Sequence, residues 1–189
     1  MNIGRIVGVF GLALCVGGAE LRAAEPCQSG LQTGQRPGPY SFVISTGKQR
    51  GQSCCFICET ADRPAVVVFA RTLTDSLGKM VRQIDQGVAN NKGSEMRAWV
   101  TFLSEDQPGL DPKVVQWSKK HATGNVPLGV FEDPVGPPTY LLAREAEVTV
   151  LLSVKQKVVA NFAFRAGELN DAGVFEIMKA LPKIVREKK

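Results

Sequence analysis

The chain has 189 residues, of which 44% are hydrophobic and 22% are charged, and its formal net charge is +5. These proportions are typical of a globular protein rather than of a disordered chain. Basic residues are spread along the sequence without interleaved aromatic residues, so no nucleic-acid interface is predicted. The basic cluster at the end of the chain, from Lys183 to Lys189, is interpreted as a solvated helix end.

The first 24 residues have the three-part layout of a secretory signal peptide. Arg5 supplies a positive charge, Ile6 to Val16 form an apolar run, and small and polar residues follow. The apolar run is shorter than the ~20 residues that span a bilayer. Export to the periplasm or secretion is therefore predicted, and a buried N-terminal helix or strand is the weaker alternative.

Signal cleavage defines the start of the mature protein. It is expected after one of three alanines, of which the later two are favoured: Ala19, Ala23 or Ala24. Lipidation at Cys15 is disfavoured, because Leu14 stands where a lipoprotein signal has a small residue. Residues 25–189 then form one domain, without a second apolar run that could span a membrane.

The first half of this domain contains a strand, a cysteine cluster, a second strand and a helix. Residues 41–45 (SFVIS) predict a short strand. The continuous apolar run 65–70 (AVVVFA) predicts a strand buried on both faces of a parallel sheet. Helical spacing of apolar residues over 73–88 predicts the helix, with Thr74 or Asp75 as its cap.

The second half continues this alternation. The expected elements are a strand at 98–103, a helix at 111–121, a strand at 126–131, a short helix at 137–145, strands at 148–154 and 158–164, and a helix at 171–187. Asp111 is expected to cap the helix at 111–121, with Pro112 at its first position. Pro182 should kink the last helix or begin a final turn. Alternating strands and helices favour an α/β protein with a parallel sheet, to which the late hairpin adds antiparallel strands.

Five segments carry a resemblance to a known family: PAVVVFAR, MRAWVTFLSED, VPLGVFEDPVGPP, VTVLLSVKQKVVANFAF and AGVFEIMKALPKIV. Their order resembles the thioredoxin-like superfamily, in its peroxiredoxin or redoxin form. The resemblance implies a three-layer α/β/α sandwich, with a mixed central sheet, a C-terminal β-hairpin and a final helix.

The usual active site of that family is absent from the sequence. The family's reactive cysteine follows the first central strand, where residues 71–77 contain no cysteine here. Its cis-proline loop precedes the hairpin, where residues 147–149 contain no proline, and Pro127 is interpreted as a strand-start residue. Neither half of the family's redox site can be carried over to this chain.

Four cysteines remain after signal removal, and all four are disulfide candidates: Cys27, Cys54, Cys55 and Cys58. An even number in an exported protein favours disulfides, and four cysteines allow three pairings. The pairing that joins Cys54 to Cys55 is disfavoured because a vicinal bond is strained. Either Cys55 bonds to Cys58 and Cys27 to Cys54, or Cys27 bonds to Cys55 and Cys54 to Cys58.

The C-x-x-C motif formed by Cys55 and Cys58 is a tentative redox pair, and it gives the leading hypothesis for function. Two such thiols can close a small ring reversibly, so that one attacks a substrate disulfide and the other resolves the product. Such a protein would exchange with an unknown protein thiol or disulfide partner. The alternative is a non-catalytic binding or structural domain whose cysteines form structural disulfides.

Charges near the motif affect its expected reactivity. Glu59 and Asp62 would raise the pKa of nearby thiols, and Arg50 and Arg63 could offset them. No helix is expected at the motif, because Pro64 and a strand follow within a few residues. The structural alternative is therefore a disulfide-stapled hairpin tip, and a peroxiredoxin-like enzyme with a displaced cysteine is a third possibility.

Other chemistry is weakly indicated, and no cofactor or metal is predicted. A zinc or copper site would lack ligands, because there is one C-x-x-C pair and Cys27 is remote. The single histidine, His121, and two serines without an evident base, Ser76 and Ser104, do not predict catalysis. Acidic residues near strand ends are interpreted as caps and turn residues: Asp75, Glu105, Asp106 and Asp133. Two tryptophans are expected in the core or half-buried: Trp99 and Trp117.

Overall fold

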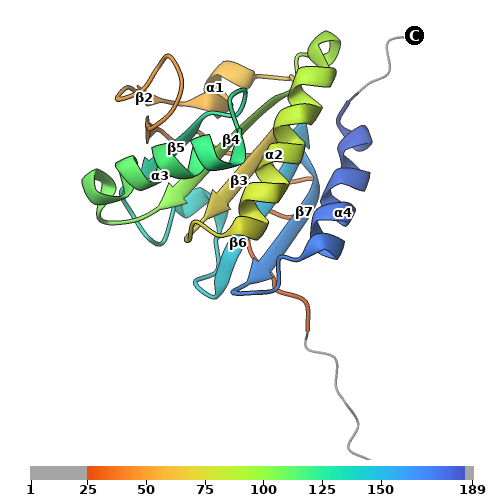
Figure 1. The fold of residues 1–189 in the computed structure, drawn as a ribbon. Coiled ribbons are helices and arrows are strands. Elements are labelled where there is room, and N and C mark those ends of the chain that lie inside the picture. Colours follow the sequence, from red (N-terminus) through yellow and green to blue (C-terminus); the bar gives the residue numbers. More distant parts are fainter. Residues whose placement is uncertain (1–24, 186–189) are drawn as a thin grey trace, which may run out of the picture.

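A computed structural model describes residues 25–185 (Figure 1). Its seven-stranded sheet has the order β2-β1-β5-β4-β3-β6-β7. The strands are β1 (Phe42–Ile44), β2 (Ser53–Cys54), β3 (Ala65–Ala70), β4 (Arg97–Leu103), β5 (Leu128–Phe131), β6 (Ala146–Val154) and β7 (Lys157–Arg165). The helices are α1 (Phe56–Thr60), α2 (Asp75–Asn90), α3 (Gln107–His121) and α4 (Asp171–Ala180), with short 3-10 helices η1 (Lys92–Ser94), η2 (Pro138–Tyr140) and η3 (Leu181–Lys183). The predicted signal peptide and Cys15 lie outside the described residues.

Strand β3 lies inside the sheet and all six of its residues are buried. It pairs in parallel with β4, where Val67 lies opposite Trp99, and antiparallel with β6, where Val67 lies opposite Leu151. Because side chains alternate along a strand, Val66 and Val68 enter one core cluster and Val67 enters the other. The uninterrupted apolar run therefore fits a strand that is covered on both faces.

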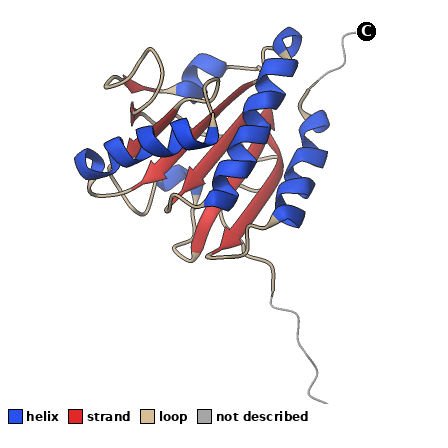
Figure 2. Cartoon of the chain, in the orientation of Figure 1, coloured by secondary structure: helices blue, strands red, loops and turns tan. Residues whose placement is uncertain are grey.

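Helices α2, α3 and α4 pack on one face of the sheet (Figures 1 and 2). The connections β3-α2-β4 and β4-α3-β5 both step in the same direction across the sheet. Right-handed crossovers in the same direction place both helices on the same face. The observed packing follows this rule, since Ile84 of α2 and Trp117 of α3 share one core cluster with Ile177 of α4.

The opposite face is covered by α1, η2 and the N-terminal segment. Tyr40 of this segment accepts a hydrogen bond from Trp99 Nε1 at 2.8 Å, and its hydroxyl lies 2.9 Å from Thr101 Oγ1. Tyr140 of η2 donates to the Gly38 carbonyl at 2.8 Å. These buried polar groups are paired, so the layer is fixed by specific contacts as well as by apolar packing.

The α/β fold class, the central strands and the C-terminal hairpin are confirmed, and both tryptophans are buried. The predicted start of the second long helix at Asp111 is wrong. Asp106 caps α3 by accepting a bond from Gly109 N at 2.9 Å, and Pro112 lies inside the helix. The expected strand at 126–131 starts at Leu128, and the expected helix at 137–145 is limited to η2. The last helix ends at Ala180 rather than at the expected residue 187, and Pro182 lies in the final turn η3, which is one of the two outcomes expected for it.

Candidate functional site

Cys55 and Cys58 are joined by a disulfide with a Cα–Cα distance of 5.4 Å. Contrary to the sequence prediction, a helix does start at this motif, because Cys55 caps α1. The Cys55 carbonyl accepts hydrogen bonds from Cys58 N at 3.1 Å and from Glu59 N at 3.2 Å. One helical turn places residues three apart on the same side, so the two sulfurs can bond without distorting the chain.

The disulfide helix is anchored on the sheet by its two buried residues, Phe56 and Thr60. The Phe56 ring lies 5.6 Å from the Phe42 ring and 5.7 Å from the Trp99 ring. This anchoring leaves Cys58 exposed and Cys55 half-buried. Cys58 is therefore the partner of the disulfide that another molecule can approach more easily.

Cys27 and Cys54 are unpaired. Of the bonds in the two predicted pairings, only Cys55–Cys58 is formed. Cys27 is not bonded to Cys54, and neither of them is bonded to Cys55 or Cys58. Cys54 lies on β2 at one edge of the sheet, whereas Cys27 lies near Arg165 at the end of β7, the other edge. Burial and, to a lesser extent, Glu59 raise the pKa of the Cys54 thiol. Cys54 is therefore a weaker nucleophile at neutral pH than an ordinary thiol.

The arginines expected to support a thiolate are engaged elsewhere. Arg50 forms an ion pair with Asp111 at 2.6 Å. Arg63 donates from Nε to the Thr60 carbonyl at 3.0 Å and from Nη2 to the Glu59 carbonyl. The Glu59 carboxylate accepts a bond from Arg97 at 3.1 Å. The structure thus brings an acid and its partner arginine beside the motif, but it directs neither predicted arginine to the sulfurs.

The disulfide lies at the amino end of β3, since α1 immediately precedes that strand (Figure 1). The family position for a reactive cysteine lies at the other end of β3, where α2 begins. There Thr74 accepts a hydrogen bond from Leu77 N at 3.2 Å, and the Thr74 carbonyl accepts one from Trp117 at 3.2 Å. This position is occupied by helix-capping and packing contacts.

Asp75 at the start of α2 lies between two basic residues of α3. Its carboxylate is 2.6 Å from Lys120 Nζ and 3.3 Å from His121 Nε2. The His121 ring packs against Gly78, where an added Cβ would lie 2.4 Å from the ring, and against Trp117 at 4.8 Å. His121 therefore has a packing role between two helices.

Lys120→Met is expected to raise the pKa of Asp75. The hydrogen bond and the charge of Lys120 are the main causes that hold this pKa below its usual range. A lowered pKa stabilises the fold above the unfolded value of about 3.9, and this contribution disappears as pH falls through the folded pKa. Carboxyl NMR titration measures the shift. Lys119→Met is the matched control, and an unchanged Asp75 pKa in Lys120→Met would contradict the assignment.

The other predicted polar residues have local structural contacts. Ser104 Oγ accepts a bond from Asp106 N at 3.1 Å, and Asp133 accepts one from Val135 N at 2.7 Å. Glu105 and Asp133 line a hollow with Arg71. These contacts agree with the predicted roles as caps and turn residues.

Arg71 is a residue that sequence reasoning missed. Its guanidinium donates to the carbonyls of Ala146 at 2.9 Å, Ala143 at 3.1 Å and Pro134. It thereby ties the loop before β6 to the end of β3. An arginine directly after a buried strand was the available signal, but its carbonyl partners are remote in sequence.

Ala61 at the end of α1 has a conformation that favours glycine, with φ 51° and ψ −124°. Such conformations cost an alanine about 1–3 kcal/mol, whereas the extra flexibility of an unfolded glycine costs about 0.4–1 kcal/mol. Ala61→Gly should therefore raise the free energy of unfolding by about 1 kcal/mol, measured by urea denaturation. Ala172→Gly in the first turn of α4 is the control and should lower it. A lower free energy of unfolding for Ala61→Gly would show that the backbone of Ala61 is not strained.

Comparison with known proteins gives structural similarity only. No protein-family model and no curated protein matches the chain. A candidate protein disulfide isomerase from Bacteroides thetaiotaomicron is 13% identical, with a TM-score of 0.62 over 84% of this chain and 94% of that one. A candidate thiol:disulfide interchange protein, DsbE, from Chlorobium tepidum is 15% identical, with a TM-score of 0.55 over 80% and 99%. Peroxidoxin BcpB from Mycobacterium tuberculosis is 16% identical, with a TM-score of 0.56 over 83% and 99%.

These similarities show that the chain has a thioredoxin-like fold, in a divergent form. The activity must then be argued from the site, because one fold can carry many functions. Within residues 25–185, no helix has the length and apolar character needed to cross a membrane. The same residues contain no group of three or more histidine, cysteine or acidic side chains placed to hold a metal ion.

Proposed function

We propose that the protein is an exported thiol–disulfide redox protein that acts through Cys55 and Cys58 on a polypeptide partner. The observation that carries this proposal is the disulfide itself, whose partner Cys58 is exposed while Cys55 is half-buried. Structural similarity to proteins named for disulfide exchange supports the same chemistry. Export is supported by the N-terminal sequence and by the disulfide, which persists in oxidising compartments.

The greater exposure of Cys58 than of Cys55 sets the proposed order of steps for oxidation of a substrate dithiol. A substrate thiolate attacks Cys58 Sγ, the Cys55–Cys58 bond breaks, and Cys55 leaves as a thiolate that takes up a proton. A second substrate thiolate then attacks the substrate sulfur of the mixed disulfide and releases Cys58. The substrate loses two electrons and forms a disulfide, while the protein gains them as two thiols. Reduction of a substrate disulfide follows the same steps in reverse.

The surroundings of the motif predict slow exchange. Helix α1 has five residues, so it offers little of the dipole stabilisation that a longer helix gives to a thiolate. Glu59 is adjacent to Cys58 and disfavours a second negative charge there. Arg97 is paired with Glu59 and partly offsets this effect.

A structural disulfide is the second candidate. It is favoured by the burial of Phe56 and Thr60, which makes α1 part of the core layer, and by the location of the motif at the opposite end of β3 from Thr74. In that case the bond would hold α1 on the sheet and would have no exchange partner.

Redox equilibration distinguishes the two candidates. The oxidised fraction of Cys55 and Cys58 would be followed by thiol alkylation in glutathione and dithiothreitol buffers, together with insulin reduction. An exchange protein should have a potential above roughly −270 mV, whereas structural disulfides lie below about −300 mV. A reduction potential below about −300 mV, together with no reduction of insulin, would reject the redox function.

A further inference from the structure

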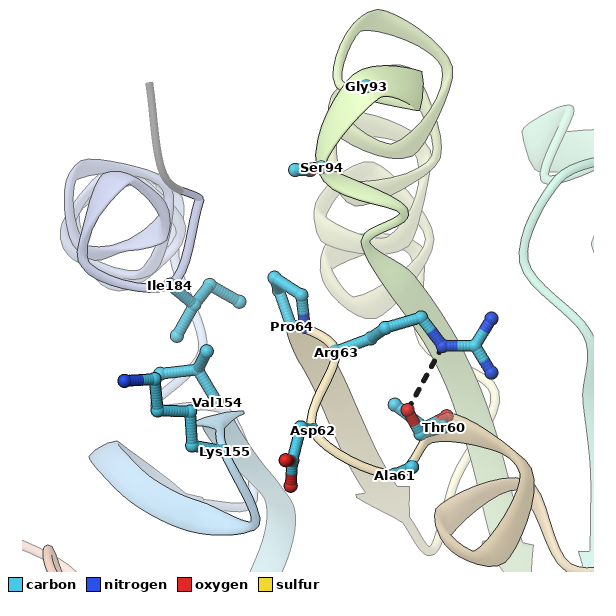
Figure 3. Close-up of a pocket in the computed structure, with 10 residues that line it drawn as sticks. All are labelled: Thr60, Ala61, Asp62, Arg63, Pro64, Gly93, Ser94, Val154, Lys155 and Ile184. Atoms are coloured by element: carbon cyan, nitrogen blue, oxygen red, sulfur yellow. Dashed lines mark hydrogen bonds between the residues drawn. The ribbon is translucent and has the colours of Figure 1, made fainter. Parts of the chain in front are cut away.

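A cavity of about 690 Å³ lies at the carboxyl end of the disulfide helix (Figure 3). Its apolar wall is formed by Ala61, Pro64, Val154 and Ile184. Figure 3 shows Pro64 and Ile184 facing one another across the space, although Pro64 directly precedes β3 and Ile184 follows α4 and η3. Cavities of this size are typical of ligand sites and can hold a large apolar side chain.

The cavity wall begins two residues beyond Cys58. Thr60, the last residue of α1, belongs to this wall. Consecutive Cα atoms are ~3.8 Å apart, so the Cα atoms of Cys58 and Thr60 lie no more than ~7 Å from one another. Side chains two residues apart on a helix point to different faces, so a peptide held in the cavity would have to extend around α1 for its cysteine to meet Cys58.

The rim of the cavity has excess positive charge. Two of the lining residues, Arg63 and Lys155, are basic, and Lys155 forms no ion pair within residues 25–185. The acidic lining residue is Asp62, whose carboxylate already accepts a bond from Gln156 at 2.8 Å. An occupant with an apolar side chain and a neighbouring acidic group would complement this charge.

The wall near α1 is held in place before any ligand binds. Lys155 N donates to the Asp62 carbonyl at 3.0 Å, which ties the hairpin turn to the segment after α1. Arg63 Nε donates a hydrogen bond to the Thr60 carbonyl at 3.0 Å. A preformed wall lowers the ordering cost of binding.

We infer that this cavity binds an apolar side chain, next to an acidic residue, of the polypeptide whose cysteine exchanges with Cys58. The inference rests on the proposed function for the exchange step alone. The acidic residue of the peptide would face Arg63 and Lys155.

Synthetic peptides test the occupant. Each peptide would carry Leu-Glu, Leu-Lys or Ser-Ser about two to four residues from a cysteine, a reach of ~7–14 Å in an extended chain. In versions with serine in place of cysteine, wild-type protein should bind Leu-Glu about tenfold more tightly than Ser-Ser. Equal affinity for Leu-Glu and Ser-Ser would overturn the inference.

Two variants with matched comparisons locate the binding. Ser94→Trp should fill the cavity and remove the preference for Leu-Glu, whereas Ser94→Ala, which loses the same hydroxyl, should keep it. Lys155→Glu should lower the affinity for Leu-Glu about two- to fivefold and favour Leu-Lys, and Lys157→Glu on the same hairpin should do neither. Unchanged binding in Ser94→Trp would overturn the cavity as the site.

Exchange is measured separately with the cysteine peptides. Binding of the serine versions without exchange by the cysteine versions would reject the proposed function and leave the cavity assignment standing. Exchange at equal rates for all peptides, with no binding preference, would reject the cavity assignment and leave the proposed function standing. A higher exchange rate for Leu-Glu that is lost in Ser94→Trp supports both.

Discussion

Cys58→Ser is expected to lower the rate of thiol–disulfide exchange by at least about a hundredfold, because it removes the more exposed cysteine of the pair, at which we propose that a substrate thiolate attacks. Cys58 is exposed and Cys55 is half-buried in the oxidised protein. Exchange should therefore begin at Cys58, even though Cys55 is the first cysteine of the motif. The measurement is the rate of insulin reduction together with trapping of mixed disulfides by mass spectrometry.

Cys55→Ser provides the complementary result. Without Cys55 the mixed disulfide on Cys58 cannot be resolved within the motif, so it should accumulate, whereas Cys58→Ser should form little of it. Both variants should be made in a Cys54→Ser background, because Cys54 is the neighbouring unpaired thiol. Mixed disulfides on Cys55 rather than Cys58 would contradict the assigned order of attack. Full exchange activity in Cys58→Ser would contradict the role of the motif.

Asp85→Ala is expected to lower the free energy of unfolding by about 3 kcal/mol. Asp85 lies on α2 and is 6% exposed. Its carboxylate accepts bonds from Asn125 N at 2.6 Å, Asn125 Nδ2 at 2.9 Å and Val126 N at 3.0 Å. Removing the acceptor leaves backbone donors unpaired in the turn before β5, and such groups are costly when buried.

Urea denaturation measures this loss, and a decrease in melting temperature of roughly 10 °C should accompany it. Gln86→Ala is the matched control, because Gln86 is the exposed neighbour on the same helix. Asp85→Asn should have an intermediate effect, since an amide keeps one acceptor but directs its own donors toward other donors. A difference between Asp85→Ala and Gln86→Ala of less than about 1 kcal/mol would show that the turn relaxes and pairs with water.

Local chain properties made much of the fold predictable. The run at 65–70 is uniformly apolar because β3 is buried on both faces, and the turn at Lys155 and Gln156 forms the expected hairpin. Sequence reasoning failed at the start of α3, where Pro112 fits a first helical position. Asp106 caps the helix earlier, and α3 accommodates Pro112 in its interior. A helix start at Asp106 and one at Asp111 are both compatible with the local sequence, and only the packing of α3 on the sheet selects between them.

The sequence left the Cys55–Cys58 bond as one of two possible pairings, and it did not reveal the surroundings of the motif. The spacing of Cys55 and Cys58 is enough for a disulfide across one helical turn, because that geometry is local. The helix itself was missed, since its stability comes from Phe56 packing against Trp99, which is distant in sequence. The engagement of Arg50 with Asp111 was missed for the same reason.

The sequence alone determined that the Cys55 and Cys58 motif precedes the central strand and has a spacing that permits a disulfide, because both depend on local spacing and on the pattern of apolar residues. Tertiary structure decided that these two cysteines are the bonded pair, that Cys58 is the exposed partner and that a cavity lies at the end of α1. These features depend on contacts between residues far apart along the chain, such as Thr60, Val154 and Ile184. No local pattern specifies such contacts, since they arise only when the sheet and its covering layers assemble.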